Sequence, residues 1–130
     1  MKRRYPAIDW LGHVPHARIP DLLAQTGLFF HAGRRDYFPR AIPEAMGCGR
    51  PVVAFADRIG ADVLPDECGL RVTERDYRPL VAALLRDERR RKTMEERGVQ
   101  VARERFTVTA SVAAMERLYH QLVSAGQERR

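Results

Sequence analysis

The sequence has little cysteine and no long apolar run, and both absences narrow its class. Two cysteines, Cys48 and Cys68, among 130 residues cannot form a disulfide framework, so we expect a reduced, cytoplasmic setting. No run of about 18 apolar residues occurs, which argues against a membrane-spanning helix. The basic residues near the start, within 1–6, have no apolar segment behind them, so they do not have the form of a signal peptide.

The chain has fewer acidic than basic residues, and this positive net charge raises the question of an anionic partner. The chain has 23 Lys and Arg against 17 Asp and Glu, a net charge of +6. Nucleic acid, an anionic membrane surface or an anionic substrate would each suit this charge. No helix-turn-helix, zinc-finger or RNA-binding aromatic signature accompanies it, so no nucleic-acid partner is expected. The basic run at 86–92 has the composition of a solvated helix face, and peripheral membrane contact stays open.

The chain is long enough for one domain with one core, since 45% of its 130 residues are hydrophobic. Short apolar runs alternate with amphipathic stretches. This alternation predicts an α/β fold with a parallel sheet of about four strands, flanked by helices and ending in a long C-terminal helix. Residues 124–130 are expected to form a disordered basic tail. The predicted strands are 7–12, 28–31, 51–55 and 69–72, and the predicted helices are 18–25, 77–85, 94–106 (with a break at Gly98 left open) and 108–122.

The most informative stretch is residues 36–54, which read DYFPRAIPEAMGCGRPVVA. It predicts a loop, a short helix, a tight turn and a buried strand. Two prolines confine the start of the helix, and Gly47 and Gly49 suit a helix end at which the backbone takes positive φ. Two carboxylates, Asp36 in the loop and Glu44 on the helix, stand eight positions apart. A polar ligand beyond the carboxyl ends of the strands could reach both of them.

These residues resemble the C-terminal donor-binding domain of the retaining GT-B glycosyltransferases, of the type called glycosyl transferases group 1 or family 4. That family has Glu, seven residues, Glu, and then Ala-Met-Ala-x-Gly-x-Pro-Val-Val-Ala. Here Asp36 is followed by seven residues, Glu44 and AMGCGRPVVA, an EX7E-like motif with Asp in the first place. The resemblance covers roughly residues 7–123. It implies that 1–123 are a partial nucleotide-sugar-binding domain, the C-terminal half of a GT-B fold, with a partial Rossmann-like parallel sheet.

The resemblance implies transfer of a sugar from a nucleotide sugar to an unknown acceptor, with retained configuration. The donor is a substrate, and no metal or other cofactor is implied. Asp36 takes the place of the catalytic acid that meets the transferred sugar, and Glu44 takes the place of the acid that binds the ribose. The backbone from Phe38 through Pro39 to Arg40 takes the place of the groups that hold donor oxygens.

Further contacts implied by the resemblance lie outside the motif. His13 and Val14, in the loop after the first predicted strand, match the family's backbone contact near the nucleotide base. Gly60 matches its contact with the transferred sugar. His13 and His16 are three positions apart but have no third ligand nearby, so we expect ordinary loop histidines and no metal site.

Two departures from the family pattern affect the predicted site. Asp36 is one methylene shorter than the usual Glu, and Pro43 replaces an aliphatic residue. If the helix starts near Ile42 or Pro43, the proline costs little stability, but an earlier start would displace the second acid. Arginines at the motif, Arg34, Arg35 and Arg40, either bind the donor diphosphate or form exposed charge.

The residues that resemble the family do not include its acceptor-binding N-terminal domain or the first βαβ unit of its donor domain, where the family carries an Arg and a Lys for the diphosphate. We therefore expect negligible transfer by this polypeptide alone, and a separate chain supplying the N-terminal domain becomes a candidate partner. The alternative is a non-catalytic nucleotide-binding or partner-docking module. It would use the free edge of the sheet and the last helix. The apolar residues of that helix recur at alternating spacings of four and three: Val108, Val112, Met115, Tyr119 and Leu122.

Overall fold

The computed structural model describes residues 5–33, 36 and 38–127. Its centre is a sheet of three parallel strands: β1 (Phe29–His31), β2 (Val52–Phe55) and β3 (Gly69–Val72). The strands lie in the order β1-β2-β3, so β2 is central. Phe29 pairs with Val52, and Val52 pairs with Gly69. Because the strands are parallel, their carboxyl ends meet at one edge of the sheet.

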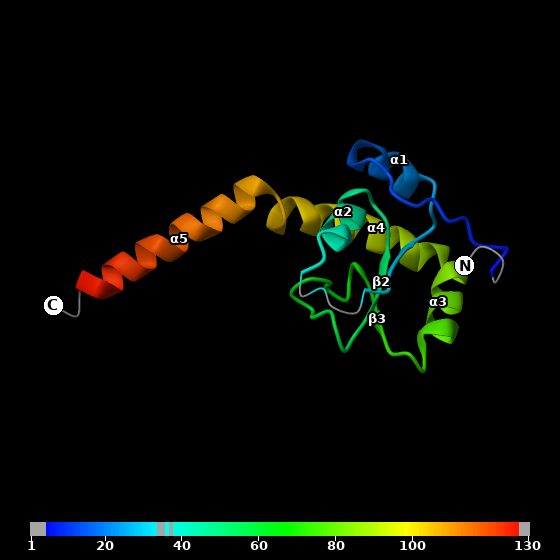
Figure 1. Cartoon of the computed structure of the whole chain (residues 1–130). Helices are drawn as coiled ribbons and strands as arrows, with labels where there is room; N and C mark the ends of the chain where they lie inside the picture. The colour runs from blue at the N-terminus through cyan, green and yellow to red at the C-terminus, as the bar shows by residue number, and fades with distance from the viewer. Residues whose placement is uncertain (1–4, 34–35, 37, 128–130) are drawn as a thin grey trace.

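Helices connect and cover these strands. Five α-helices and one short 3-10 helix are described: η1 (His16–Arg18), α1 (Ile19–Ala24), α2 (Ala41–Gly47), α3 (Tyr77–Arg86), α4 (Glu88–Arg105) and α5 (Val108–Gln127). Figure 1 shows α1 to α4 gathered around the sheet and α5 projecting away from this body. The segment β1-α2-β2 is a βαβ unit, the connection that parallel strands require.

Burial on both faces explains why residues 51–55 form the central strand. Val52 and Ala54 belong to a core cluster with α2 and the second half of α4, and Val53 belongs to a cluster with α3. All three side chains are fully buried. A strand covered on both faces reads as a continuous apolar run, as this segment does. The α/β class and the parallel sheet predicted from the sequence are confirmed.

The end of α2 shows how its two glycines are used. The amide of Gly49 donates to the carbonyl of Met46 at 2.9 Å, and the amide of Arg50 donates to the carbonyl of Ala45 at 2.9 Å. These two bonds form a Schellman motif, in which the residue beyond the helix is left-handed. Gly49 takes φ 68°, whereas Gly47 is the last residue of the helix. Of the pair, Gly49 alone supplies the positive φ.

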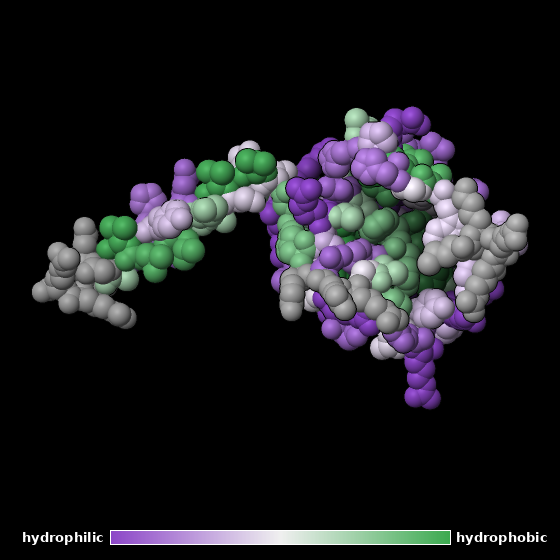
Figure 2. All heavy atoms as spheres, in the orientation of Figure 1, coloured by the Kyte–Doolittle hydropathy of each residue, from purple (hydrophilic) through white to green (hydrophobic). Residues whose placement is uncertain are grey.

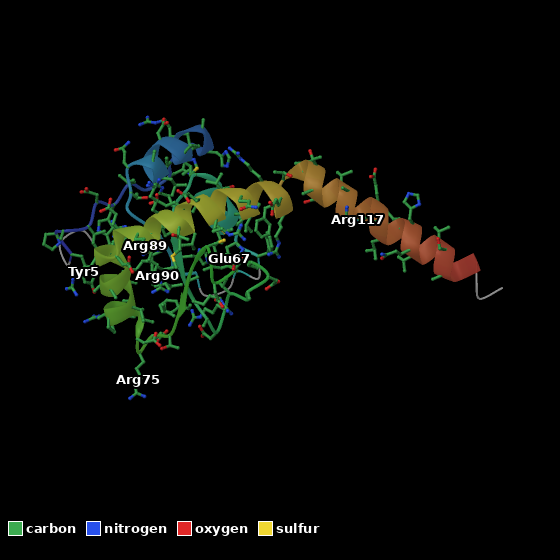
Figure 3. All side chains as sticks on the ribbon, turned by 180° about the vertical axis from the view of Figure 1, so that it is seen from behind. Tyr5, Glu67, Arg75, Arg89, Arg90 and Arg117 are labelled. Atoms are coloured by element: carbon green, nitrogen blue, oxygen red, sulfur yellow. The ribbon has the colours of Figure 1, made fainter. Side chains whose placement is uncertain are left out.

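Helix α4 continues through Gly98, so the sequence suggestion of a break there is wrong. Gly98 is buried against α2: a Cβ at this position would lie 3.5 Å from the carbonyl oxygen of Met46, an ordinary van der Waals distance. Asp87 is the N-cap of α4, since its side chain accepts a hydrogen bond from the amide of Arg90 at 2.9 Å. Arg89 and Arg90 are exposed on the first turns of α4 (Figure 3), as expected of a solvated helix face.

Residues 7–12 do not form the predicted fourth strand. They form a turn, in which the amide of Ile8 donates to the carbonyl of Tyr5 at 3.2 Å, and then an irregular segment. Trp10 and Leu11 are 40% and 62% exposed. A strand satisfies its backbone groups by pairing with a neighbour, and no strand of the described residues lies beside this segment. The sheet therefore has three strands in the described part of the chain.

Helix α5 carries its apolar side chains on an open surface. Figure 2 shows them along the projecting helix, and shows a second apolar region in a hollow of the body. The helix reaches Gln127, whereas the chain was expected to fray from Ser124; residues 128–130 lie outside the described part. The apolar residues of α5 that are 48% to 81% exposed are Val108, Val112, Met115, Leu118, Tyr119, Leu122 and Val123.

Candidate functional site

The carboxyl edge of the sheet gathers several predicted site residues. Asp36 follows the end of β1 by five residues, and Gly60 follows the end of β2 by the same number. Because β1 and β2 are neighbouring parallel strands, the two loops leave the sheet at the same edge. The first turn of α2, which carries Glu44, follows the Asp36 loop. Ligands of open α/β sheets bind at such an edge.

Pro43 does not disrupt the helix that carries Glu44. Helix α2 begins at Ala41, so Pro43 lies in its first turn. The first amides of a helix have no partner within it, and a proline there removes no hydrogen bond. The amide of Glu44 donates to the carbonyl of Arg40 at 3.1 Å. The second acid of the motif is therefore held on a regular helical turn.

Glu44 contacts a histidine that the sequence reasoning assigned to an ordinary loop. Its Oε1 lies 3.3 Å from Nε2 of His16, which belongs to η1. The Glu44 side chain is 37% exposed and that of His16 is 79% exposed, so solvent screens this pair and a ligand can displace it. The contact brings the loop that holds His13 and Val14 close to the start of α2.

A cleft of about 410 Å³ lies beside Glu44. Phe38 and Arg40 line it on the side of the motif, and the end of α4 and the start of α5 form the other wall. The rings of Phe38 and Phe106 meet edge to face with centroids 5.9 Å apart. Pro39 is buried, whereas Arg40 is exposed. The described residues of the lining are Phe38, Arg40, Pro43, Glu44, Gly47, Ala102, Arg103, Phe106, Thr107 and Ser111.

Asp36, the predicted catalytic acid, lies outside the lining of this cleft. Its side chain is 56% exposed, and its Oδ2 lies 3.5 Å from Nε2 of His31. His31 is the last residue of β1 and its side chain is only 11% exposed. The two acids of the motif thus each contact a histidine, Asp36 at the strand end and Glu44 on the helix. Sequence reasoning missed His31, although its place at the end of a predicted strand was a usable signal.

The remaining predicted residues have the following surroundings. His13 and Val14 line a smaller pocket of about 220 Å³ together with Leu22 of α1. Gly60 lies in the turn after β2, where its carbonyl accepts hydrogen bonds from the amides of Val63 at 3.2 Å and Leu64 at 3.0 Å. Arg34 and Arg35, the other candidates for the diphosphate, lie outside the described residues.

Two further features are absent from the described residues. Within these ranges, no cluster of three or more His, Cys, Asp or Glu side chains has a geometry that could hold a metal ion. Among the helices in the described ranges, none is both long and apolar enough to span a bilayer.

Comparison with known proteins identifies the class. Residues 2–88 match the family model described as Glycosyl transferases group 1, and the chain belongs to this family. Among solved structures, sucrose-phosphate synthase from Thermosynechococcus elongatus is similar, with a TM-score of 0.75 and 26% sequence identity. That match covers 95% of this chain and 33% of the other, so the chain spans about a third of that structure's length. No curated protein sequence matches this chain.

The family and the fold predicted from the acidic motif are therefore confirmed: the chain is a group 1 glycosyltransferase segment with part of a GT-B fold. The roles given to Asp36, Glu44 and the neighbouring residues stay predictions.

Proposed function

We propose that this chain is the donor-binding part of a retaining glycosyltransferase, which transfers a sugar from a nucleotide sugar to an acceptor. One observation carries the proposal: the loop of Asp36, the first turn of α2 with Glu44, and the turn of Gly60 all adjoin the carboxyl edge of β1 and β2. This is the edge at which sheets of this kind bind nucleotides. Glu44 would accept hydrogen bonds from the ribose hydroxyls, and Asp36 would meet the transferred sugar.

The chemistry assigned to the chain's own residues is mainly electrostatic. Arg40 lines the cleft beside Glu44, and a guanidinium group suits diphosphate oxygens. Positive side chains and backbone amides aimed at the leaving diphosphate would stabilise the charge that develops there, without a metal ion. A carboxylate at Asp36 would stabilise the positive charge that develops on the sugar.

Transfer also requires an acceptor site, which we propose is supplied by further polypeptide, in the same chain or in a separate one. The similar synthase is about three times longer. β1 is an edge strand, and an apolar pocket of about 370 Å³ lies between β1 and α3, with Phe30, Tyr77 and Leu85 in its lining. A further strand and helix would cover both features. We therefore expect the purified chain alone to show negligible transfer, and robust turnover by it would contradict this part of the proposal.

Ligand binding tests the proposal directly. Nucleoside diphosphates and their sugars are screened by thermal shift, because a ligand that binds the native state alone raises stability. The nucleoside diphosphate of at least one base should raise the melting temperature. Asp36→Ala should reduce the shift caused by the nucleotide sugar more than the shift caused by the nucleoside diphosphate. If no ligand of the panel raised the melting temperature, the donor-binding proposal would be refuted.

A second function, a non-catalytic docking module, is favoured by the open apolar surface of α5. Val112 and Tyr119 are 48% and 60% exposed on this helix. In that case Val112→Asp and Tyr119→Asp would abolish self-association or partner binding, as measured by light scattering on a size-exclusion column. Substitutions at Asp36 and Glu44 would leave that association unchanged. The donor-binding function would be favoured if the variants at Asp36 and Glu44 lost nucleotide binding while these two variants and the two α5 variants kept the wild-type association.

A further inference from the structure

His31, Gly33 and Asp36 form a close group at the end of β1, and only Asp36 belongs to the acidic motif. Nε2 of His31 lies 3.5 Å from Oδ2 of Asp36, and Gly33 lies between the two side chains. The imidazole is held by the sheet and is largely buried, whereas the carboxylate stands on a loop and is more than half exposed. An anchored ring therefore adjoins the acid that is predicted to meet the sugar.

The nitrogen of His31 is buried without a hydrogen bond. Nε2 has no hydrogen-bond partner among the described residues, and at 3.5 Å the approach to Asp36 is too long to count as a normal one. Removing a polar nitrogen from water without a partner destabilises a fold. Hydrogen bonds of binding sites are often long in the free protein and shorten when the ligand is bound. The loose contact is therefore of the kind that a bound sugar would complete.

The backbone between the two side chains is shaped to let them meet. A Cβ added at Gly33 would lie 2.5 Å from Nε2 of His31 and 2.7 Å from Oδ2 of Asp36. Contacts this short are not made by real side chains, so any larger residue would push the ring and the carboxylate apart. The short side chain of Asp36 also keeps its carboxylate near the end of the strand, within reach of the ring.

We propose that His31 is a positioning residue of the donor site, whose Nε2–H holds the carboxylate of Asp36 in the orientation that meets the transferred sugar. The inference rests on the proposed function of Asp36. A half-exposed aspartate on a loop can adopt several orientations, and an anchored N–H beside it favours the productive one as the contact shortens around the bound sugar. Gly33 contributes by leaving the space in which the two groups approach.

Two variants test this inference by different routes. His31→Leu removes the ring nitrogen, and Gly33→Ala leaves both side chains intact but separates them. Each should weaken binding of the nucleotide sugar by about tenfold, the loss of roughly one charged hydrogen bond, without weakening binding of the matching nucleoside diphosphate. His31→Gln, which places an N–H near the same position, should restore most of the affinity. Dissociation constants come from isothermal titration with the best ligand pair of the thermal-shift panel.

Matched controls separate this effect from general damage. Gly27→Ala changes another loop glycine, one whose added Cβ would meet nothing within 4 Å. His120→Leu changes an exposed histidine on α5. Both should bind like the wild type, and melting temperatures show whether each variant is folded. Unchanged nucleotide-sugar affinity in a folded Gly33→Ala variant would overturn the role of His31 and leave the proposed function standing.

A measurement without ligand completes the test. The ¹⁵N chemical shifts of an imidazole report which ring nitrogen carries the proton. In the wild type, His31 should carry it on Nε2, and Asp36→Asn should move the His31 ring signals more than the His120 ring signals. If Asp36→Asn left the His31 ring signals unchanged, the contact between His31 and Asp36 would be refuted. Failure of the wild type to bind any nucleotide sugar would instead refute the proposed function, and with it the donor-site role of His31.

Discussion

Glu44→Ala should weaken binding of a nucleoside diphosphate by about tenfold to one hundredfold and leave the fold intact. Among the described residues, the Glu44 carboxylate pairs with an exposed histidine, His16, at 3.3 Å, and solvent screens this pair, so losing the carboxylate removes little stability. Hydrogen bonds to a charged group contribute about 1.5–3 kcal/mol each, and roughly 1.4 kcal/mol is tenfold in affinity. One or two ribose hydrogen bonds to a carboxylate that is 37% exposed correspond to the lower part of that range.

The assay is thermal shift at a fixed ligand concentration. At ten times the wild-type dissociation constant, the ligand stabilises the wild type by about 1.4 kcal/mol, and a variant bound tenfold more weakly by about 0.4 kcal/mol. At about 4 °C per kcal/mol for a domain of this size, the shifts are about 6 °C and about 2 °C. Glu116→Ala, an exposed acid on α5, is the matched control and should keep the full shift. A Glu44→Ala protein that keeps the wild-type shift would refute the ribose role of Glu44.

Three further predictions concern the fold and the thiols. Ile42 is fully buried on α2, so Ile42→Ala should cost about 2–5 kcal/mol in urea unfolding, whereas Ile8→Ala, at a side chain 48% exposed, should cost far less. Gly49 has φ 68°, so Gly49→Ala should destabilise the protein by about 1–2 kcal/mol and Gly49→Asn by less; equal losses would argue against backbone strain as the cause. Burial and then the charge of Glu67 raise the pKa of Cys68 to about 11, so at pH 8 its thiol stays protonated, and alkylation followed by mass spectrometry should label the half-buried Cys48 first. Labelling of both thiols at the same rate in the folded protein would contradict that assignment.

Local rules explain why much of the fold could be predicted. The apolar run at 51–55 predicts a doubly buried strand, and β2 is one, since period and length are properties of the segment itself. The Gly-rich end of the short helix predicts a left-handed cap, and Gly49 provides it. The run from Glu44 to Ala54 identifies the family because backbone turns and packing both constrain it.

The errors arose where a local pattern depends on a partner. Residues 7–12 are apolar enough for a strand, but a strand requires a paired neighbour, and the described residues provide none. Gly98 is unfavourable in an isolated helix, but α4 is packed against Met46 of α2 at this position and continues through it. In both cases a contact distant in the sequence decided the outcome.

The sequence by itself determined the order of strands and helices from residue 18 onward, because spacing, burial preference and turn chemistry act over a few residues. It also carried the acidic motif, whose resemblance pointed to the family. Only the tertiary structure decided that Asp36 lies against His31 and that Glu44 lies against His16. Glu44 and His16 are 28 positions apart, so packing between elements brings them together. Asp36 and His31 are near in sequence, but their contact depends on how the chain leaves the end of β1, which residue spacing alone does not fix.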